Sequence, residues 1–329
     1  MKMFKISSVF LVVIFILIGC SDTNDNSAAE DTTELTVYTT IYPIEYAAKK
    51  IAGESIAIET VYPPGVDEHS YELTSKDMVK IAESDAFIYL GAGLEALAET
   101  SAEALSSQDV KLIEIGQHNE LFMAAEDTHS DEAHTEEDEE PADHNEESGH
   151  EDHGHEGIDP HIWLDPLKMI ELSRIIKDEL IDINPNEEAT YNENFAALEE
   201  DLMELDQKYI DTLEEKTNKQ LLVSHAAFGY WEERYDLKQI AISGLSTSSE
   251  PSQKELTEIV DQAKQYELEY VLYEQNTSNR VTEIIQEQIG AEALTIHNLA
   301  VLTEEDIENE EDYISLMNYN LEILDKAIK

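Results

Sequence analysis

Histidine residues are the side chains whose positions in this sequence most suggest chemistry. His161 lies in residues 154–166, which read GHEGIDPHIWLDP, and two Asp-Pro pairs flank it. Proline disfavours helix at the residue before it, so we expect this segment to be extended or turned. A histidine held on such a stiff loop by bulky apolar neighbours is suited to bind a metal ion. Considered alone, the segment fits a turn histidine without a ligand equally well.

Two further histidines stand beside apolar or aromatic residues. His69 lies in the loop at residues 63–72, PPGVDEHSYE, and His225 lies just beyond the apolar run that ends at residue 223. Neutral imidazole suits zinc, which takes nitrogen ligands in tetrahedral geometry. The three histidines are spread over more than 150 positions, so spacing alone does not establish that they converge. For each of them alone, a structural role is the better interpretation.

The composition excludes several classes of partner. The chain has 329 residues with 20 basic and 74 acidic side chains, a formal charge of −54. Its length predicts two domains of ordinary size. So negative a chain is unsuited to bind nucleic acid, or to dock on anionic lipid by charge, but it attracts cations. Much of the charge lies on predicted helix surfaces, where it also fits a solubility adaptation to a salty or alkaline exterior.

The first residues are expected to be an export signal. A basic start and an apolar run at residues 9–18 end in LIGC at Cys20, the only cysteine. This resembles a bacterial lipoprotein signal, which implies removal of residues 1–19 and lipid on the Cys20 sulfur. An uncleaved anchor would leave the chain on the same outer face of the membrane. Residues 20–33 are polar and are expected to form a flexible tether.

In the first half of the chain, short β-branched runs alternate with helical patterns. This rhythm predicts a parallel sheet covered on both faces. Loops beyond the carboxyl ends of such strands form binding crevices, and His69 lies on one of these loops. The predicted strands are residues 35–40, 56–62, 86–90 and 111–115, and the predicted helices are one that ends at residue 53, 74–82 and 94–105.

Residues 126–158 interrupt this rhythm with fifteen acids, six histidines and no Lys or Arg. The segment lacks the apolar surface needed to fold alone, so we expect it to be disordered. Histidine mixed with carboxylates at this density gathers metal ions weakly and in many geometries. That role is favoured over a solvated acidic loop without function, because acid alone would need no histidines.

The second half predicts a long helix followed by another alternating block. Residues 187–216 contain no Gly or Pro and carry one apolar stripe, which predicts a strut about 40 Å long. The fold class is therefore α/β, with two similar lobes of mainly parallel sheet at residues 34–186 and 217–329 joined by that helix. The other predicted helices are 167–183, 226–235, 252–266, one ending at 289 and one from about 311, with strands at 220–223, 239–242, 270–273 and 294–296.

Five features occur in a fixed order along the chain. They are Cys20, the loop EHSYE at 68–72, the acidic His-rich insertion, DPHIWLDP, and VSHAAFGY at 223–230. Together they resemble the zinc-binding lipoproteins of ABC-type metal importers, a cluster that also contains manganese-binding members. The resemblance covers nearly the whole mature chain. It implies two lobes bridged by a single helix, with one metal ion in the cleft between them.

Carried over by position, His69, His161 and His225 match the three histidine ligands of that family. Manganese-type members usually have a carboxylate in place of His225, so the resemblance favours Zn²⁺. It implies an extracytoplasmic receptor, anchored by lipid at Cys20, that hands zinc to a membrane ABC permease. A monomer that binds no nucleic acid and is not an enzyme is expected.

The fourth ligand departs from the family pattern. Many members supply an acid after the last strand, where this sequence has Ala300. Water, Glu68 or His297 then remain as candidates for the fourth position. Glu274, a further acid at a strand end, is interpreted as lining or structural.

Three alternative functions remain at this point. They are a manganese receptor of the same family, an adhesin-like surface lipoprotein and a zinc hydrolase, since three protein ligands plus water is also a catalytic pattern. The sequence contains no HExxH and no GxSxG motif, and Glu68 is the only candidate general base. The hydrolase is therefore the least favoured of the three.

Overall fold

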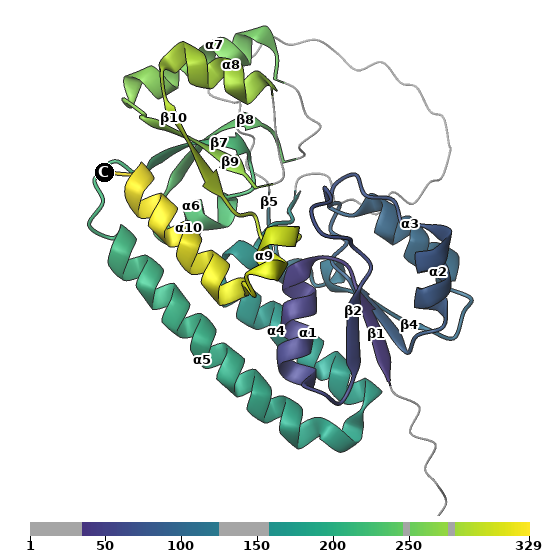
Figure 1. Ribbon diagram of the computed structural model, residues 1–329. Coiled ribbons are helices and arrows are strands. Elements are labelled where there is room, and N and C mark those ends of the chain that lie inside the picture. The colour runs from purple at the N-terminus through teal and green to yellow at the C-terminus, as the bar shows by residue number, and fades with distance from the viewer. Residues whose placement is uncertain (1–34, 125–157, 246–250, 276–279) are drawn as a thin grey trace, which may run out of the picture. The chain divides into compact units, whose positions relative to one another are not determined.

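A four-stranded parallel sheet is formed by the first part of the chain (Figure 1). The computed structural model describes residues 35–124, 158–245, 251–275 and 280–329. The strand order is β2 (Ala57–Thr60), β1 (Thr36–Thr39), β3 (Ala86–Tyr89) and β4 (Lys111–Glu114), and all three pairings are parallel. All four residues of β3 are buried, as expected of a strand inside a sheet covered on both faces.

Three helices cross between these strands, as the alternating pattern predicts. They are α1 (Tyr42–Ala52), α2 (Ser75–Ala82) and α3 (Ala96–Leu105). Helix α1 ends at Gly53, whose φ of +58° is a conformation that glycine adopts without strain. Thr74 caps α2 through a capping box with Asp77. Helices α2 and α3 lie together on one side of the sheet, whereas α1 lies on the other (Figure 1).

The second part of the chain forms another four-stranded parallel sheet. Its order is β10 (Glu292–Ile296), β9 (Tyr270–Glu274), β7 (Gln220–His225) and β8 (Lys238–Ser243). Helices α7 (Gln253–Gln265) and α8 (Arg280–Ile289) pack beside each other over a separate apolar cluster that includes Leu222 and Ile285. Ser252 and Glu255 form a capping box at the start of α7.

Long helices run beside both sheets. Helix α4 (Pro166–Ile183) packs against α5 (Glu188–Leu213), which has 26 residues and is therefore about 39 Å long. Helix α5 also packs against α1, next to the first sheet, and against α6 (Gly229–Tyr235) and α10 (Tyr313–Ala327), next to the second (Figure 1). Its predicted apolar stripe is buried. In the described part of the chain, no helix combines the length and the apolar character needed to cross a membrane.

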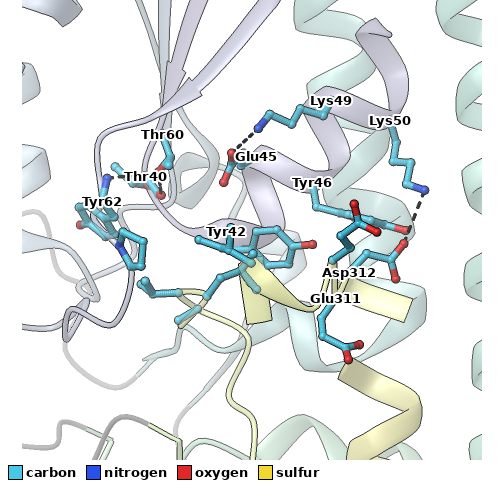
Figure 2. Close-up of a pocket in the computed structure, with 16 residues that line it drawn as sticks. Thr40, Tyr42, Glu45, Tyr46, Lys49, Lys50, Thr60, Tyr62, Glu311 and Asp312 are labelled. Carbon is cyan, nitrogen blue, oxygen red and sulfur yellow. Dashed lines mark hydrogen bonds and ion pairs between the residues drawn. The ribbon is translucent and has the colours of Figure 1, made fainter. Parts of the chain in front are cut away.

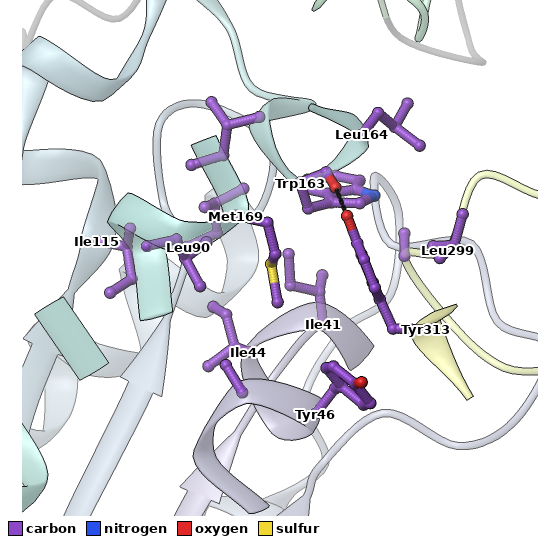
Figure 3. Packing of buried hydrophobic residues seen from close by; sticks show 14 of the residues in the cluster. Ile41, Ile44, Tyr46, Leu90, Ile115, Trp163, Leu164, Met169, Leu299 and Tyr313 are labelled. Carbon is purple, nitrogen blue, oxygen red and sulfur yellow. Dashed lines mark hydrogen bonds between the residues drawn. The ribbon is translucent and has the colours of Figure 1, made fainter. Parts of the chain in front are cut away.

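The two sheets share one continuous apolar core, which adds to the connection made by α5. Trp163 lies at its centre, fully buried, and its indole Nε1 donates a hydrogen bond to the Asn298 carbonyl at 2.7 Å. The Tyr313 hydroxyl donates to the Trp163 carbonyl at 2.6 Å (Figure 3), and the Tyr313 ring stacks on Tyr46 of α1. The apolar residues after His161 therefore hold that segment against both halves of the chain.

Several predicted boundaries were wrong. Ile158, which was placed in a disordered segment, pairs with Ala124 where β5 (Met123–Ala124) meets β6 (Ile158–Asp159). The helix predicted from residue 226 begins at Gly229, because residues 226–228 form the turn after β7. The short helix α9 (Glu304–Glu308) was not predicted. The signal peptide, Cys20, the tether and residues 126–157 of the His-rich insertion lie outside the described residues.

Candidate metal centre

Three histidines from distant parts of the chain converge at one point. His69 lies in the loop after β2, His161 follows β6, and His225 is the last residue of β7. Their ring centroids are 5.8, 5.6 and 5.2 Å apart, and one potential ligand atom of each lies within 4.8 Å of the other two. Within the described ranges, no other group of three or more His, Cys, Asp or Glu residues meets this criterion.

The Nε2 atoms of all three rings are buried and have no hydrogen-bond partner among the described residues. His161 is fully buried, and His225 is 2% exposed. A buried polar atom without a partner costs about 1–3 kcal/mol, so such atoms are rare unless a bound ligand satisfies them. Three of them around one point form a suitable donor set for a cation that takes imidazole nitrogen.

Asp159 orients the His161 ring. Its Oδ1 accepts hydrogen bonds from the His161 backbone N–H at 3.0 Å and from Nδ1 at 2.8 Å. The proton is therefore assigned to Nδ1, and the lone pair on Nε2 is available to a metal. A Cβ atom at Gly229 would lie 2.4 Å from Asp159 Oδ2, so a glycine at the start of α6 makes room for this carboxylate. The Tyr230 hydroxyl donates to the Asp159 carbonyl at 2.8 Å.

Glu274 does the same for His225. The His225 Nδ1–H donates to Glu274 Oε1, and the Ser224 hydroxyl donates to the same oxygen at 3.3 Å. Burial disfavours a charged His225, but the charge and hydrogen bond of Glu274 outweigh it and raise the pKa of His225. Burial likewise opposes ionisation of Glu274, but His225 outweighs it and lowers the pKa of Glu274. Glu274, interpreted from sequence as lining or structural, is thus the hydrogen-bond partner of His225.

His69 differs from His225 in the direction in which its pKa is shifted. Burial, and then the proximity of His161 and His225, lowers the pKa of His69 to about 3. Its imidazole is therefore neutral at physiological pH, as metal ligation requires. The neighbouring Glu68 is 4% exposed, its Oε1 lies 3.9 Å from His69 Nε2, and burial raises the pKa of its carboxyl to about 8.

Asn298, which sequence reasoning missed, joins the acids of this site. It lies two residues beyond the end of β10, and its Nδ2 donates to Glu68 Oε1 at 3.2 Å and to Glu274 Oε2 at 2.8 Å. The signal that could have identified it is its position, because His225 and Glu274 also stand at the carboxyl ends of strands in this sheet.

His297 and Ala300, which lie near Asn298 in the sequence, do not supply a ligand to the histidine cluster. His297 uses both ring nitrogens elsewhere: Nε2–H donates to Asp306 Oδ2 at 3.0 Å, and Nδ1 accepts from the Leu299 N–H at 2.9 Å. Ala300 is buried, and its N–H donates to Asn298 Oδ1 at 3.0 Å. Of the three candidates for the fourth position, His297 is therefore the least suitable.

A separate pocket of about 550 Å³ lies between α1 and residues 300–312 (Figure 2). Its charges are largely paired, since Lys49 Nζ lies 2.5 Å from Glu45 Oε1 and Lys50 Nζ lies 3.7 Å from Asp312 Oδ2. No histidine is among the described residues that line it. This pocket is therefore distinct from the histidine cluster.

Comparison with known proteins adds relatives of similar sequence and fold. Residues 37–327 match the family described as the zinc-uptake complex component A, periplasmic. The chain is 32% identical to the zinc-binding lipoprotein AdcA of Streptococcus pneumoniae over 324 residues, which cover 98% of this chain and 60% of AdcA. It is 27% identical to the high-affinity zinc uptake system protein ZnuA of Bacillus subtilis over 327 residues, 99% of this chain and 97% of that protein.

A solved structure shows the same architecture. The Zn(II)-bound ZnuA-like domain of Streptococcus pneumoniae AdcA matches with a TM-score of 0.68 and 31% identity, over 89% of this chain and 98% of that domain. The chain thus spans 60% of the length of full AdcA, and it corresponds to the ZnuA-like domain. Because the family match covers residues 37–327, the chain belongs to the family of the zinc-uptake complex component A, periplasmic.

Proposed function

We propose that this chain is a zinc receptor that binds one Zn²⁺ through His69, His161 and His225. The observation that carries this proposal is the convergence of three buried Nε2 atoms that lack a partner among the described residues. Two of the rings have Nδ1 engaged by a carboxylate, which presents Nε2 to the ion. The relatives named as zinc-binding and zinc-uptake proteins support the same conclusion.

The donor set favours zinc over manganese. Three neutral imidazoles suit Zn²⁺, whereas Mn²⁺ prefers carboxylate, carbonyl and water oxygens. Zinc bonds to histidine nitrogen of about 2.0–2.1 Å require the three atoms to lie roughly 3.3 Å apart. From their present spacing of up to 4.8 Å, the ligand atoms must therefore move closer together by up to about 1.5 Å. We assign the fourth position to water, because both ring nitrogens of His297 are hydrogen-bonded and Glu68 Oε1 accepts a hydrogen bond from Asn298 Nδ2.

In this proposal the receptor works outside the cytoplasm and hands its ion to a membrane ABC permease. The family is a binding component of an uptake complex, which agrees with the prediction that the chain is not an enzyme. Attachment of lipid at Cys20, a monomeric state, and lobes at residues 34–186 and 217–329 complete the proposal. The lipoprotein name of AdcA supports the anchored form.

The test measures zinc affinity by competition with a chelator of known affinity, so that weak sites do not contribute. His161→Ala is expected to weaken zinc binding at the tight site by more than about a hundredfold. Such a loss exceeds the roughly tenfold to hundredfold effect of mutating a residue that only hydrogen-bonds to a metal ligand. His118→Ala is the matched control, since the His118 side chain is 41% exposed and lies outside the cluster. Equal affinities in the two variants would contradict the proposal, and ester or peptide hydrolysis lost in His161→Ala would favour the hydrolase.

A further inference from the structure

The Asn298 side chain uses its full hydrogen-bonding capacity at a buried position. Asn298 is 5% exposed. Its Nδ2 donates one hydrogen to Glu68 and the other to Glu274, and its Oδ1 accepts from Gln275 Nε2 at 2.9 Å and from the Ala300 N–H at 3.0 Å. The main chain of Asn298 is also fixed, because its carbonyl accepts from Trp163 Nε1 and its N–H donates to Gln275 Oε1. The amide is thus held in one orientation.

This amide lies between two carboxylates that flank the histidine cluster from different parts of the chain. Glu68 belongs to the loop after β2 and is the neighbour of His69. Glu274 ends β9 and holds His225. The two acids are 4% and 2% exposed. Because both accept a hydrogen bond from the same NH₂ group, each carboxylate is fixed in place, and Glu68 Oε1 is held 3.9 Å from His69 Nε2. Closer approach of either bonded oxygen to the histidines would stretch or break that bond.

We propose that Asn298 determines the metal selectivity of the site by holding the carboxylates of Glu68 and Glu274 outside the coordination shell. This inference rests on the proposed zinc-binding function. An unrestrained carboxylate beside three imidazoles would add one or two oxygen ligands. Higher coordination numbers with charged oxygen suit Mn²⁺, whereas zinc is satisfied by four ligands. By keeping these oxygens engaged, the amide keeps the site at three nitrogens and one water.

The main chain of Ala300 takes part in the same arrangement. The Ala300 N–H donates to Asn298 Oδ1, and its carbonyl accepts from the Tyr42 N–H at 2.8 Å. Ala300 thus supports Asn298 through its backbone and contributes no ligand from its side chain. Both features reduce the number of oxygen donors that reach the ion.

The test compares zinc and manganese dissociation constants for wild type, Asn298→Leu and Asn298→Ala. Leucine has the same branching and the same number of side-chain heavy atoms as asparagine but donates no hydrogen bond. The ratio of the Mn²⁺ to the Zn²⁺ dissociation constant is expected to fall by about tenfold in both variants. This is the lower end of the effect typical of mutating a residue that supports a metal site without being a ligand. Adding Glu68→Gln to Asn298→Leu should move the ratio back toward the wild-type value, because only Glu274 then remains without the hydrogen bond from Asn298. With Co²⁺ as probe, visible absorption should weaken in Asn298→Leu, because the coordination number rises above four.

Asn320→Ala is the matched control. Asn320 is also a buried asparagine, but its side chain bonds only to the backbone N–H and carbonyl of His297, at 2.8 and 2.7 Å. It should lose stability without a change in the metal ratio. The proposal is overturned if zinc and manganese affinities change in parallel, or if the Co²⁺ spectra of wild type and Asn298→Leu agree. It is also overturned if Glu68→Gln alone costs more than about tenfold in zinc affinity, since Glu68 would then already be a ligand.

These outcomes are separate from a failure of the proposed function. If wild type binds no zinc tightly, or if His161→Ala binds it equally well, the zinc-receptor proposal fails. If wild type and His161→Ala behave as expected but the metal ratio does not respond to Asn298, only the selectivity proposal fails.

Discussion

Buried histidines occur in two neighbouring regions of this protein, and they differ in how their nitrogens are used. In the cluster of His69, His161 and His225, every Nε2 is without a partner among the described residues. In the pair of His297 and Asp306, both nitrogens of His297 are hydrogen-bonded. His161 and His297 are alike in being buried beside an aspartate at 2.8 and 3.0 Å. Burial and an acidic neighbour therefore do not distinguish a ligand histidine from a structural one.

The two histidines differ in whether the second ring nitrogen is also hydrogen-bonded. Asp159 engages His161 through Nδ1, which leaves Nε2 directed at the other two rings. His297 turns its Nε2 to Asp306 and its Nδ1 to the backbone, so no atom is left for a metal. Burial opposes ionisation of Asp306, but hydrogen bonds from His297 and Thr303 outweigh it and lower its pKa to about 2. This pair serves to hold α9 next to the end of β10.

Of the comparisons that follow, a change of pH is expected to have the largest effect on zinc affinity. It tests how the histidines of the cluster differ in their protonation. Protons compete with zinc for imidazole nitrogen, so affinity falls as pH falls. Three ordinary imidazoles would lose up to about a thousandfold per pH unit below their pKa values near 6.5. The pKa of His69 is already lowered to about 3, so it holds no proton to be displaced, whereas the raised pKa of His225 extends its competition to higher pH.

We therefore expect zinc affinity between pH 6 and pH 5 to fall by less than the roughly thousandfold expected of three ordinary imidazoles, because His69 contributes no proton to the competition. Zinc titrations at several pH values, with a chelator whose own protonation is known, measure this slope. A slope of three protons would show that His69 titrates like a solvated histidine, and it would remove the electrostatic distinction drawn for that ring.

A smaller effect is expected from the aspartates that hold the two kinds of histidine. Asp159→Ala frees the His161 ring and should weaken zinc binding by about tenfold to a hundredfold. Asp306→Ala removes the equivalent partner of His297 and should leave zinc affinity unchanged while lowering the melting temperature. Calorimetry and chelator competition on both variants provide the comparison. Similar zinc affinities in the two variants would mean that the orientation of His161 does not depend on Asp159.

The smallest effect is expected from exchanging a nitrogen for an oxygen ligand. His225→Asp should shift the preference from zinc toward manganese by about tenfold, because Mn²⁺ favours oxygen donors. The new carboxylate would also face Glu274, and a cation would relieve their repulsion. Titration of wild type and variant with both metals measures the shift. An unchanged preference would exclude His225 from the set of ligands.

Most of the helices and strands could be predicted from local patterns in the sequence. The alternation of strands and helices, the parallel sheets and the apolar stripe of α5 follow from periodicity and turn residues. The errors lie where local pattern is weak. The pair of two-residue strands at Met123 and Ile158 is held by the hydroxyl of Tyr230, which bonds to the Met123 N–H and the Asp159 carbonyl across the chain.

The sequence by itself determined which side chains were available: three histidines beside strand ends or stiff loops, no thiolate in the folded part and an excess of acid. Only the tertiary structure decided which of these side chains meet, because the partners lie up to 230 residues apart, as for Glu68 and Asn298. It also distinguished the role of His161 from that of His297, because the hydrogen bonds of each ring nitrogen depend on neighbours brought together by packing. Local spacing carries no information about those neighbours.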